Sequence, residues 1–124
     1  MYSLIILAGG FGTRLKSISN GIPKSLMTIG DSVYLEIVLK KIFEYKIERV
    51  ILSLYFKAEL FDTFIKQSRF SNKITRIVEP QPLGTGGAVK FVLKNTKLTN
   101  PFFVINGDSL SEINLNKMVE IFKT

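Results

Sequence analysis

Short apolar runs of strand length alternate with amphipathic segments of helical length along this chain, and that alternation most constrains its fold. Ser3 to Ala8 is nearly all apolar, as expected of a strand buried on both faces of a parallel sheet. Residues 32 to 45 carry apolar side chains at helical spacing, with charged side chains between them, which predicts a helix. A strand followed by a helix and another strand favours right-handed crossovers. The sequence therefore predicts an α/β fold: a Rossmann-like three-layer sandwich with a mostly parallel sheet.

The same alternation continues to the last residue. The predicted elements are a strand at 49–54, a helix at 57–67, a strand at 73–78, a loop at 79–87, a short helix at 88–93, a strand at 102–105 and a helix at 115–122. In the helix at 57–67, four apolar side chains are expected to face the core: Leu60, Phe61, Phe64 and Ile65.

The amino-acid composition limits the chemistry. A chain of 124 residues suits one domain. It has no Cys and no His, which excludes disulfides, Cys/His zinc sites, a cysteine nucleophile and a Ser-His-Asp triad. Any metal must therefore be held by carboxylates, and Mg²⁺ is the expected ion.

The net charge of +7, from 17 basic and 10 acidic residues, suits an anionic ligand. The lysines are scattered and form no basic run. A nucleic-acid-binding module is the competing interpretation, but the phenylalanines lie in core-like patterns and not along a basic stripe, so we expect no nucleic-acid partner. No stretch approaches the roughly 20 apolar residues of a membrane span, which favours a cytoplasmic location with no membrane partner.

A glycine-rich segment directly follows the first predicted strand. Consecutive glycines let backbone N–H groups approach phosphate oxygens, and Arg14 adds a permanently charged donor. The segment matches neither a Walker A motif nor the dinucleotide-binding fingerprint, and a tight strand-to-helix turn is the alternative. The candidate nucleotide-binding residues here are Leu7, Ala8, Gly9, Gly10, Gly12, Thr13 and Arg14.

Lys24 follows Pro23, which fixes the local backbone. We therefore expect Lys24 to project from a rigid extended segment. An ordinary surface lysine is the alternative, but together with the glycine-rich segment Lys24 becomes a second cation for one polyphosphate.

The stretch from Glu79 to Ala88 combines prolines with three glycines in four residues. Glycines there let the backbone lie close to a flat ligand, which favours recognition of a base or a sugar over a plain helix cap. The candidate residues are Glu79, Gln81, Pro82, Gly84, Thr85 and Gly86.

Asp108 follows an apolar strand within Asn106-Gly107-Asp108. A carboxylate at the carboxyl end of a parallel strand is the best candidate here for binding Mg²⁺. The alternative is an Asp that caps the following turn. In open α/β sheets ligands bind where such loops meet, at the carboxyl ends of the strands.

These motifs resemble the sugar-1-phosphate nucleotidyltransferases, the NDP-sugar pyrophosphorylase group. The resemblance covers nearly the whole chain. It rests on a Gly-Gly-x-Gly-Thr-Arg-Leu stretch at 9–15, Pro23-Lys24, Glu79 with Pro-Leu-Gly-Thr-Gly-Gly-Ala at 82–88, and Gly107-Asp108.

The resemblance implies transfer of a nucleoside monophosphate from an NTP to a sugar 1-phosphate, with release of pyrophosphate and with Mg²⁺ as the cofactor. Arg14, Lys24 and Asp108 would be catalytic, and Asp108 would bind the metal. The loop at 82–88 is most similar to that of guanylyltransferases of heptose 1-phosphate and mannose 1-phosphate, which implies GTP. Thymidylyl- and uridylyltransferases have related loops and are alternatives.

Members of this family are much longer, so residues 1–124 correspond to the nucleotide-binding part, and the acceptor-sugar part is expected to be absent from this chain. Two interpretations follow: a piece of a longer enzyme, or a truncated, non-catalytic nucleotide-binding or regulatory homologue, which the stop at Thr124 favours. Self-association into a homo-oligomer is left open.

Overall fold

A four-stranded parallel sheet forms the centre of the molecule. The computed structural model describes residues 1–8, 18–19, 22–55, 57–81, 83–99 and 101–106. The strands are β1 (Tyr2–Ala8), β6 (Ile47–Leu54), β7 (Ile74–Val78) and β8 (Phe103–Asn106), in the order β7-β6-β1-β8. Every pair in this sheet is parallel, which confirms the predicted α/β fold.

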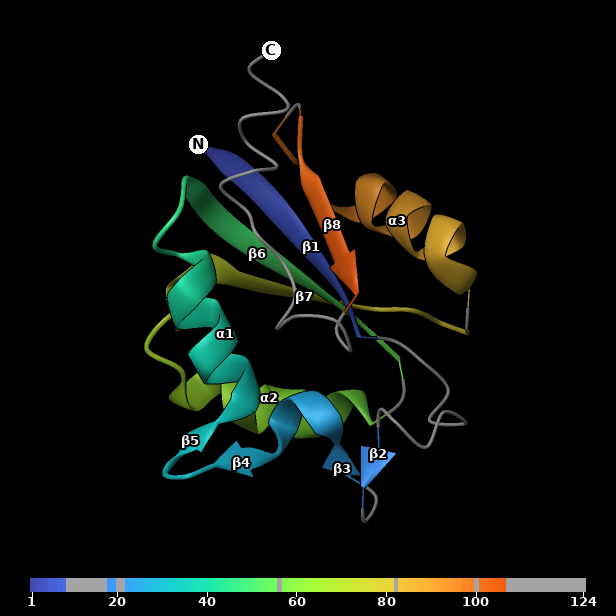
Figure 1. Ribbon diagram of the computed structural model, residues 1–124. Coiled ribbons are helices and arrows are strands. Elements are labelled where there is room, and N and C mark those ends of the chain that lie inside the picture. The colour runs from blue at the N-terminus through green and yellow to red at the C-terminus, as the bar shows by residue number, and fades with distance from the viewer. Residues whose placement is uncertain (9–17, 20–21, 56, 82, 100, 107–124) are drawn as a thin grey trace.

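Helices cover both faces of this sheet (Figure 1). Helices α1 (Tyr34–Ile42) and α2 (Ala58–Gln67) lie on one face, and α3 (Gly84–Asn95) lies on the other. The result is the predicted three-layer sandwich. Within the described ranges, no helix is long and apolar enough to cross a membrane.

Side chains of β1 alternate between the two faces, as the pleat of a strand requires. Leu4 and Ile6 pack among the buried residues of α1 and α2. Ile5 packs with Val92 of α3, and Leu7 lies on the same side. Because both faces are covered, the strand is apolar from Leu4 to Ala8.

The chain begins in the middle of the sheet. From β1 it crosses to β6 and β7 on one side, and then returns through α3 to β8 on the other side of β1. This reversal creates the topological switch point at which open α/β sheets bind ligands. The carboxyl ends are level, since Leu7 pairs with Asn106, Ala8 with Leu54, and Leu54 with Val78.

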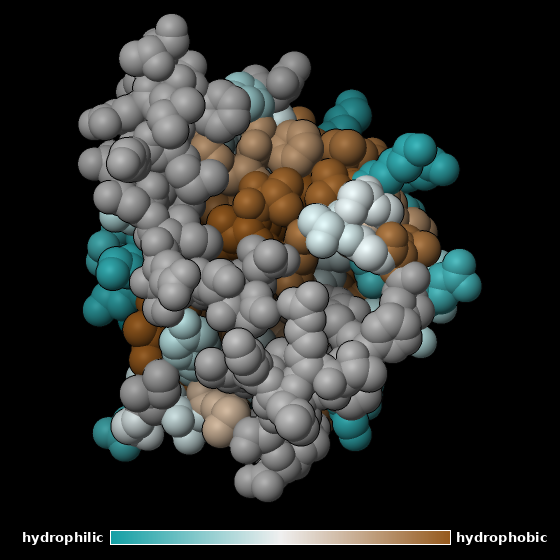
Figure 2. Space-filling model, turned by 45° about the vertical axis from the view of Figure 1, so that its right-hand side comes forward, coloured by the Kyte–Doolittle hydropathy of each residue, from teal (hydrophilic) through white to brown (hydrophobic). Residues whose placement is uncertain are grey.

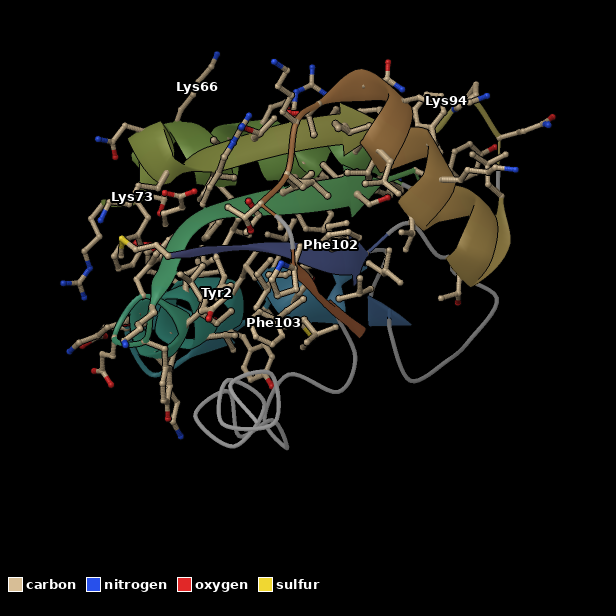
Figure 3. The ribbon with its side chains drawn as sticks, turned by 90° about the horizontal axis from the view of Figure 1, so that it is seen from above. Tyr2, Lys66, Lys73, Lys94, Phe102 and Phe103 are labelled. Atoms are coloured by element: carbon tan, nitrogen blue, oxygen red, sulfur yellow. The ribbon has the colours of Figure 1, made fainter. Side chains whose placement is uncertain are left out.

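Polar side chains at the opposite, amino-terminal edge fix the end of α3. The backbone N–H of Ser3 donates to Thr99 Oγ1 at 2.7 Å, and the N–H of Thr99 donates to Ser3 Oγ at 3.2 Å. Arg49 donates to Thr75 Oγ1 and, at 3.3 Å, to Thr96 Oγ1 beyond the end of α3. The Tyr2 and Phe103 rings meet edge to face nearby, whereas Lys66, Lys73 and Lys94 point outward (Figure 3).

Element boundaries differ from the sequence-based prediction at several points. The helix predicted at 32–45 begins at Tyr34, because a small hairpin of β4 (Thr28–Ile29) and β5 (Ser32–Val33) precedes it. A second hairpin, β2 (Ile18–Ser19) with β3 (Ile22–Pro23), and two short 3₁₀ helices, η1 (Lys24–Leu26) and η2 (Ser71–Lys73), were not predicted. These elements depend on local turns that leave little trace in hydrophobic periodicity.

Two predicted helices differ in how far the structure bears on them. Leu60 was expected to face the core and is 37% exposed, because α2 turns Ala58, Phe61 and Phe64 inward instead. The helix predicted at 115–122 lies outside the described residues.

The inward face of α2 provides a test of this packing. Phe61 is fully buried, so Phe61→Ala should lower the free energy of unfolding by about 3–5 kcal/mol. Leu93→Ala, at a half-exposed position of α3, should change it by less than about 1 kcal/mol. Urea denaturation measures both values, and equal losses would contradict the assigned packing.

Candidate functional site

The three segments that the sequence singled out begin at one edge of the sheet. The first follows Ala8 at the end of β1, the second begins at Glu79 directly after β7, and the third begins at Asn106 at the end of β8. The strand register places these ends side by side, and the N–H of Glu79 donates to Leu54 O at 2.7 Å. The predicted convergence of these strand ends is therefore confirmed.

Glu79 is a buried carboxylate at this edge, with 5% of its surface exposed. Burial raises the pKa of its carboxyl above the ordinary value of 4.5, and a hydrogen bond from the backbone N–H of Leu83 partly opposes that rise. The same hydrogen bond ties Glu79 to the residue that precedes α3. Glu79 thus joins the end of β7 to the start of α3.

The loop predicted at 79–87 is shorter than expected, because α3 begins at Gly84 and not at Ala88. Gly84, Gly86 and Gly87 therefore lie in the first turn of α3. In the first turn of any helix the backbone N–H groups lack intrahelical partners, whatever the residue type. Gly84 has φ +73°, a conformation that favours glycine. A Cβ on Gly87 would lie 2.9 Å from Leu83 Cβ, so close packing requires glycine there.

Gly86 differs from these two glycines. A Cβ built on Gly86 would meet no atom of the described part of the chain within 4 Å, and the residue is exposed. Gln81, Gly84 and Thr85 are also exposed. The fold itself therefore gives no packing reason for glycine at position 86, and this face of the first turn is accessible to a ligand.

The other predicted site residues fall into two groups. Leu7 and Ala8 are half-buried at the end of β1. Lys24 begins the 3₁₀ helix η1 directly after Pro23, so the expected extended segment ends one residue before it. Five candidate residues before η1 lie outside the described residues, namely Gly9, Gly10, Gly12, Thr13 and Arg14. Pro82 and Asp108 also lie outside them.

Ser53 was missed by the sequence analysis. It lies in β6 between Leu7 and Ile77, its register partners, and is 1% exposed. Its Oγ has no hydrogen-bond partner in the described part of the chain. The signal was present in the sequence, since Ser53 is the polar residue within the apolar run Val50 to Leu54.

No group of three or more acidic residues suited to a metal ion occurs among the residues that the structure describes. Glu79 is the carboxylate that directly follows a described strand at this edge. A metal ion would thus require oxygen ligands from elsewhere, from Asp108 or from the phosphates of a bound substrate.

Comparison with known proteins assigns this arrangement to a family. Residues 3–124 match the family model described as "Nucleotidyl transferase". The chain therefore belongs to the nucleotidyl transferase family.

Relatives and solved structures agree with this assignment. D-glycero-alpha-D-manno-heptose 1-phosphate guanylyltransferase of Campylobacter jejuni is 42% identical over 92% of this chain and 51% of its own length. The enzyme of the same name from Aneurinibacillus thermoaerophilus is 36% identical over 94% and 50%. A crystal structure of HddC from Yersinia pseudotuberculosis complexed with GMP-PN has a TM-score of 0.79 and 40% identity, over 97% of this chain and 53% of that one. The chain spans about half the length of these relatives.

The buried carboxyl of Glu79 predicts a dependence of stability on pH. Because its pKa in the folded protein is raised above 4.5, the unfolded chain loses this proton first as the pH rises. Relative to Glu79→Gln, which keeps an acceptor oxygen without the charge, the wild-type free energy of unfolding should fall as the pH rises through the raised pKa.

Urea denaturation from about pH 4 to about pH 8 measures this difference. Glu48→Gln, at an exposed position of β6, controls for the loss of a surface carboxylate. A wild-type curve parallel to that of Glu79→Gln would show that burial does not shift this group.

Proposed function

We propose that this protein binds GTP and serves in guanylyl transfer to a sugar 1-phosphate, with heptose 1-phosphate as the first choice and mannose 1-phosphate as the second. The products are pyrophosphate and an NDP-sugar, and the NDP-sugar is a precursor for surface polysaccharide. Residues 1–124 form the nucleotide-binding part of the transferase. The observation that carries the proposal is the buried Glu79 carboxylate beside the exposed first turn of α3, at the carboxyl edge of the sheet.

Glu79 supports the choice of guanine. Guanine presents a ring N–H and an exocyclic amino group side by side, and a carboxylate can accept from both. Adenine does not offer this pair of donors, and uracil and thymine offer a single ring N–H. Hydrogen bonds from guanine would replace the hydration that burial removes from the carboxylate. Gln81 and Gly84 to Gly86 would surround the base and ribose.

The triphosphate belongs at the switch point beside β1. We assign it to the backbone of Gly9, Gly10, Gly12 and Thr13, and to the Arg14 guanidinium. Lys24 would neutralise charge at the α-phosphate. This arrangement gives a use to part of the chain's net charge of +7.

Asp108 is the proposed metal ligand, since it lies two residues beyond Asn106, the end of β8. A carboxylate and phosphate oxygens are the donor set that Mg²⁺ prefers, so these residues fit that ion. Bound Mg²⁺ would supply charge neutralisation on the triphosphate. A phosphate oxygen of the sugar 1-phosphate would attack the α-phosphorus of the nucleotide in line. The bond between the α-phosphorus and the oxygen that bridges the α- and β-phosphates would break, and pyrophosphate would leave. The protein would contribute position and charge.

Calorimetric titration with GTP, ATP, UTP and dTTP, each with Mg²⁺, tests the nucleotide assignment. GTP should bind most tightly, by at least about tenfold. Pyrophosphate release is then measured against heptose, mannose and glucose 1-phosphates. Equal affinity for all four nucleotides would refute guanine recognition, and a complete protein, acceptor-sugar part included, that binds GTP without releasing pyrophosphate would be a non-catalytic homologue.

The proposed charge partners predict a loss of turnover. In a complete enzyme that includes the acceptor-sugar part, Lys24→Ala and Asp108→Ala should each lower the rate of pyrophosphate release by at least about tenfold, because each removes a group that balances charge in the transition state. Lys66→Ala removes an equal charge at a site remote from the carboxyl edge and should leave the rate unchanged (Figure 3). Unchanged rates in the first two variants would refute these roles.

A substitution at Gly86 tests whether this glycine is needed for ligand binding or for folding. Since a Cβ at position 86 would meet no atom of the described residues within 4 Å, Gly86→Ala should unfold at or above the wild-type temperature. Its affinity for GTP should nevertheless fall by at least about tenfold, because the Cβ would occupy space proposed for the ligand. Gly87→Ala is the contrasting variant, which should lose stability through its contact with Leu83. Full GTP affinity in Gly86→Ala would place the base elsewhere.

A further inference from the structure

The hydroxyl of Ser53 is a polar group that the fold leaves unexplained. Ser53 is 1% exposed, and its Oγ has no partner among the described residues. A buried hydroxyl without a hydrogen bond destabilises a protein, so such groups usually contact a ligand, an ordered water or a reacting group. The other buried serines show the contrast: Ser3 Oγ accepts from the Thr99 N–H, and Ser68 Oγ donates to Glu36.

Ser53 lies on the same side of the sheet as Glu79. Ile51, two residues before Ser53, and Ile77, two residues before Glu79, both pack in the apolar cluster that faces α3. Side chains two apart along a strand share a face. Ser53 also pairs with Ile77, two residues before Glu79, so Ser53 and Glu79 belong to neighbouring strands and lie one step apart along the sheet.

The surroundings of Ser53 suit a flat, uncharged group. Its register partners Leu7 and Ile77 are both apolar. Leu7, the partner on the β1 side, is half-buried at the end of that strand. On the same face of the sheet, Val92 of α3 packs with Ile51 and Ile77 in an apolar cluster. Figure 2 shows hydrophobic surface near the middle of the molecule in that view. Such a setting favours a nucleotide base over a triphosphate, because ionised phosphates need charged or N–H donors.

We propose that the Ser53 hydroxyl is a specificity-determining contact to the base of the bound nucleotide, deeper along the sheet than Glu79. This inference rests on the proposed function. A serine hydroxyl both donates and accepts, so it can pair with a polar edge atom of guanine that the Glu79 carboxylate cannot.

Isothermal titration of Ser53→Ala with Mg²⁺-GTP and with Mg²⁺-tripolyphosphate tests the contact. GTP should bind at least about tenfold more weakly than to wild type, whereas tripolyphosphate, which has no base, should bind equally to both. The thermal midpoint of ligand-free Ser53→Ala should be no lower than that of wild type, because the substitution removes an unpaired polar group. Ser3→Ala is the matched control: a buried serine on the same side of the sheet, at its other end, whose loss should lower the midpoint and leave GTP affinity unchanged.

The outcomes are separable. Unchanged GTP affinity in Ser53→Ala would overturn the inference, as expected if an ordered water satisfies the hydroxyl. Weaker binding of both ligands would also overturn it, since the substitution would then have disturbed the whole site. Wild-type protein that binds GTP no better than tripolyphosphate would refute the proposed function itself.

Discussion

The hydrogen-bonded pairing of β1 with β6 and β8 is the interaction on which the rest of the structure depends. It places the first strand of the chain at the centre of a parallel sheet and brings Ala8, Leu54 and Asn106 to one edge. A parallel sheet needs crossovers, and these crossovers are the helices that cover its two faces. The candidate site is therefore a consequence of strand order: the chain runs outward from β1 in one direction and reverses through α3 to β8, and open α/β sheets bind ligands at such a reversal.

Helix α3 serves the fold and the candidate site with different residues. Val92 and Ala88 are buried against the sheet, and the far end of the helix is held near Arg49 and Thr96. The first turn is fixed by Gly84, which takes a positive φ, and by Gly87, which packs closely on Leu83. Gly86 has neither function in the described structure, so a ligand offers a reason for it.

The carboxyl edge of the sheet combines an acidic side chain with nearby basic residues in the sequence, and this combination suits a nucleotide. The chain is basic overall, yet the charged side chain buried at this edge, among the residues that the structure describes, is an acid, Glu79. Burial raises the pKa of this carboxyl, which means that its charged form is held at a cost in stability. Proteins keep such groups where they bind or react. A base with N–H donors would offset the cost, while the cationic residues of the first motif suit the phosphates.

Hydrophobic pattern by itself determined the fold class, the parallel strands and the convergence of the motifs at one edge. This succeeded because buried parallel strands are continuously apolar and α1 and α2 are strongly amphipathic. The candidate residues that could be located, Glu79 and Gly84 among them, were found from residue types that packing explains poorly.

Tertiary structure decided what the pattern could not. The start of α3 at Gly84 was missed because glycines disfavour helices, whereas Glu79 and the sheet hold this turn in place. Burial of Glu79, exposure of Leu60 and the unpaired hydroxyl of Ser53 all depend on which neighbouring elements pack against those residues. A sequence states which groups are present, but the partners that each group gains or lacks exist only once distant segments meet.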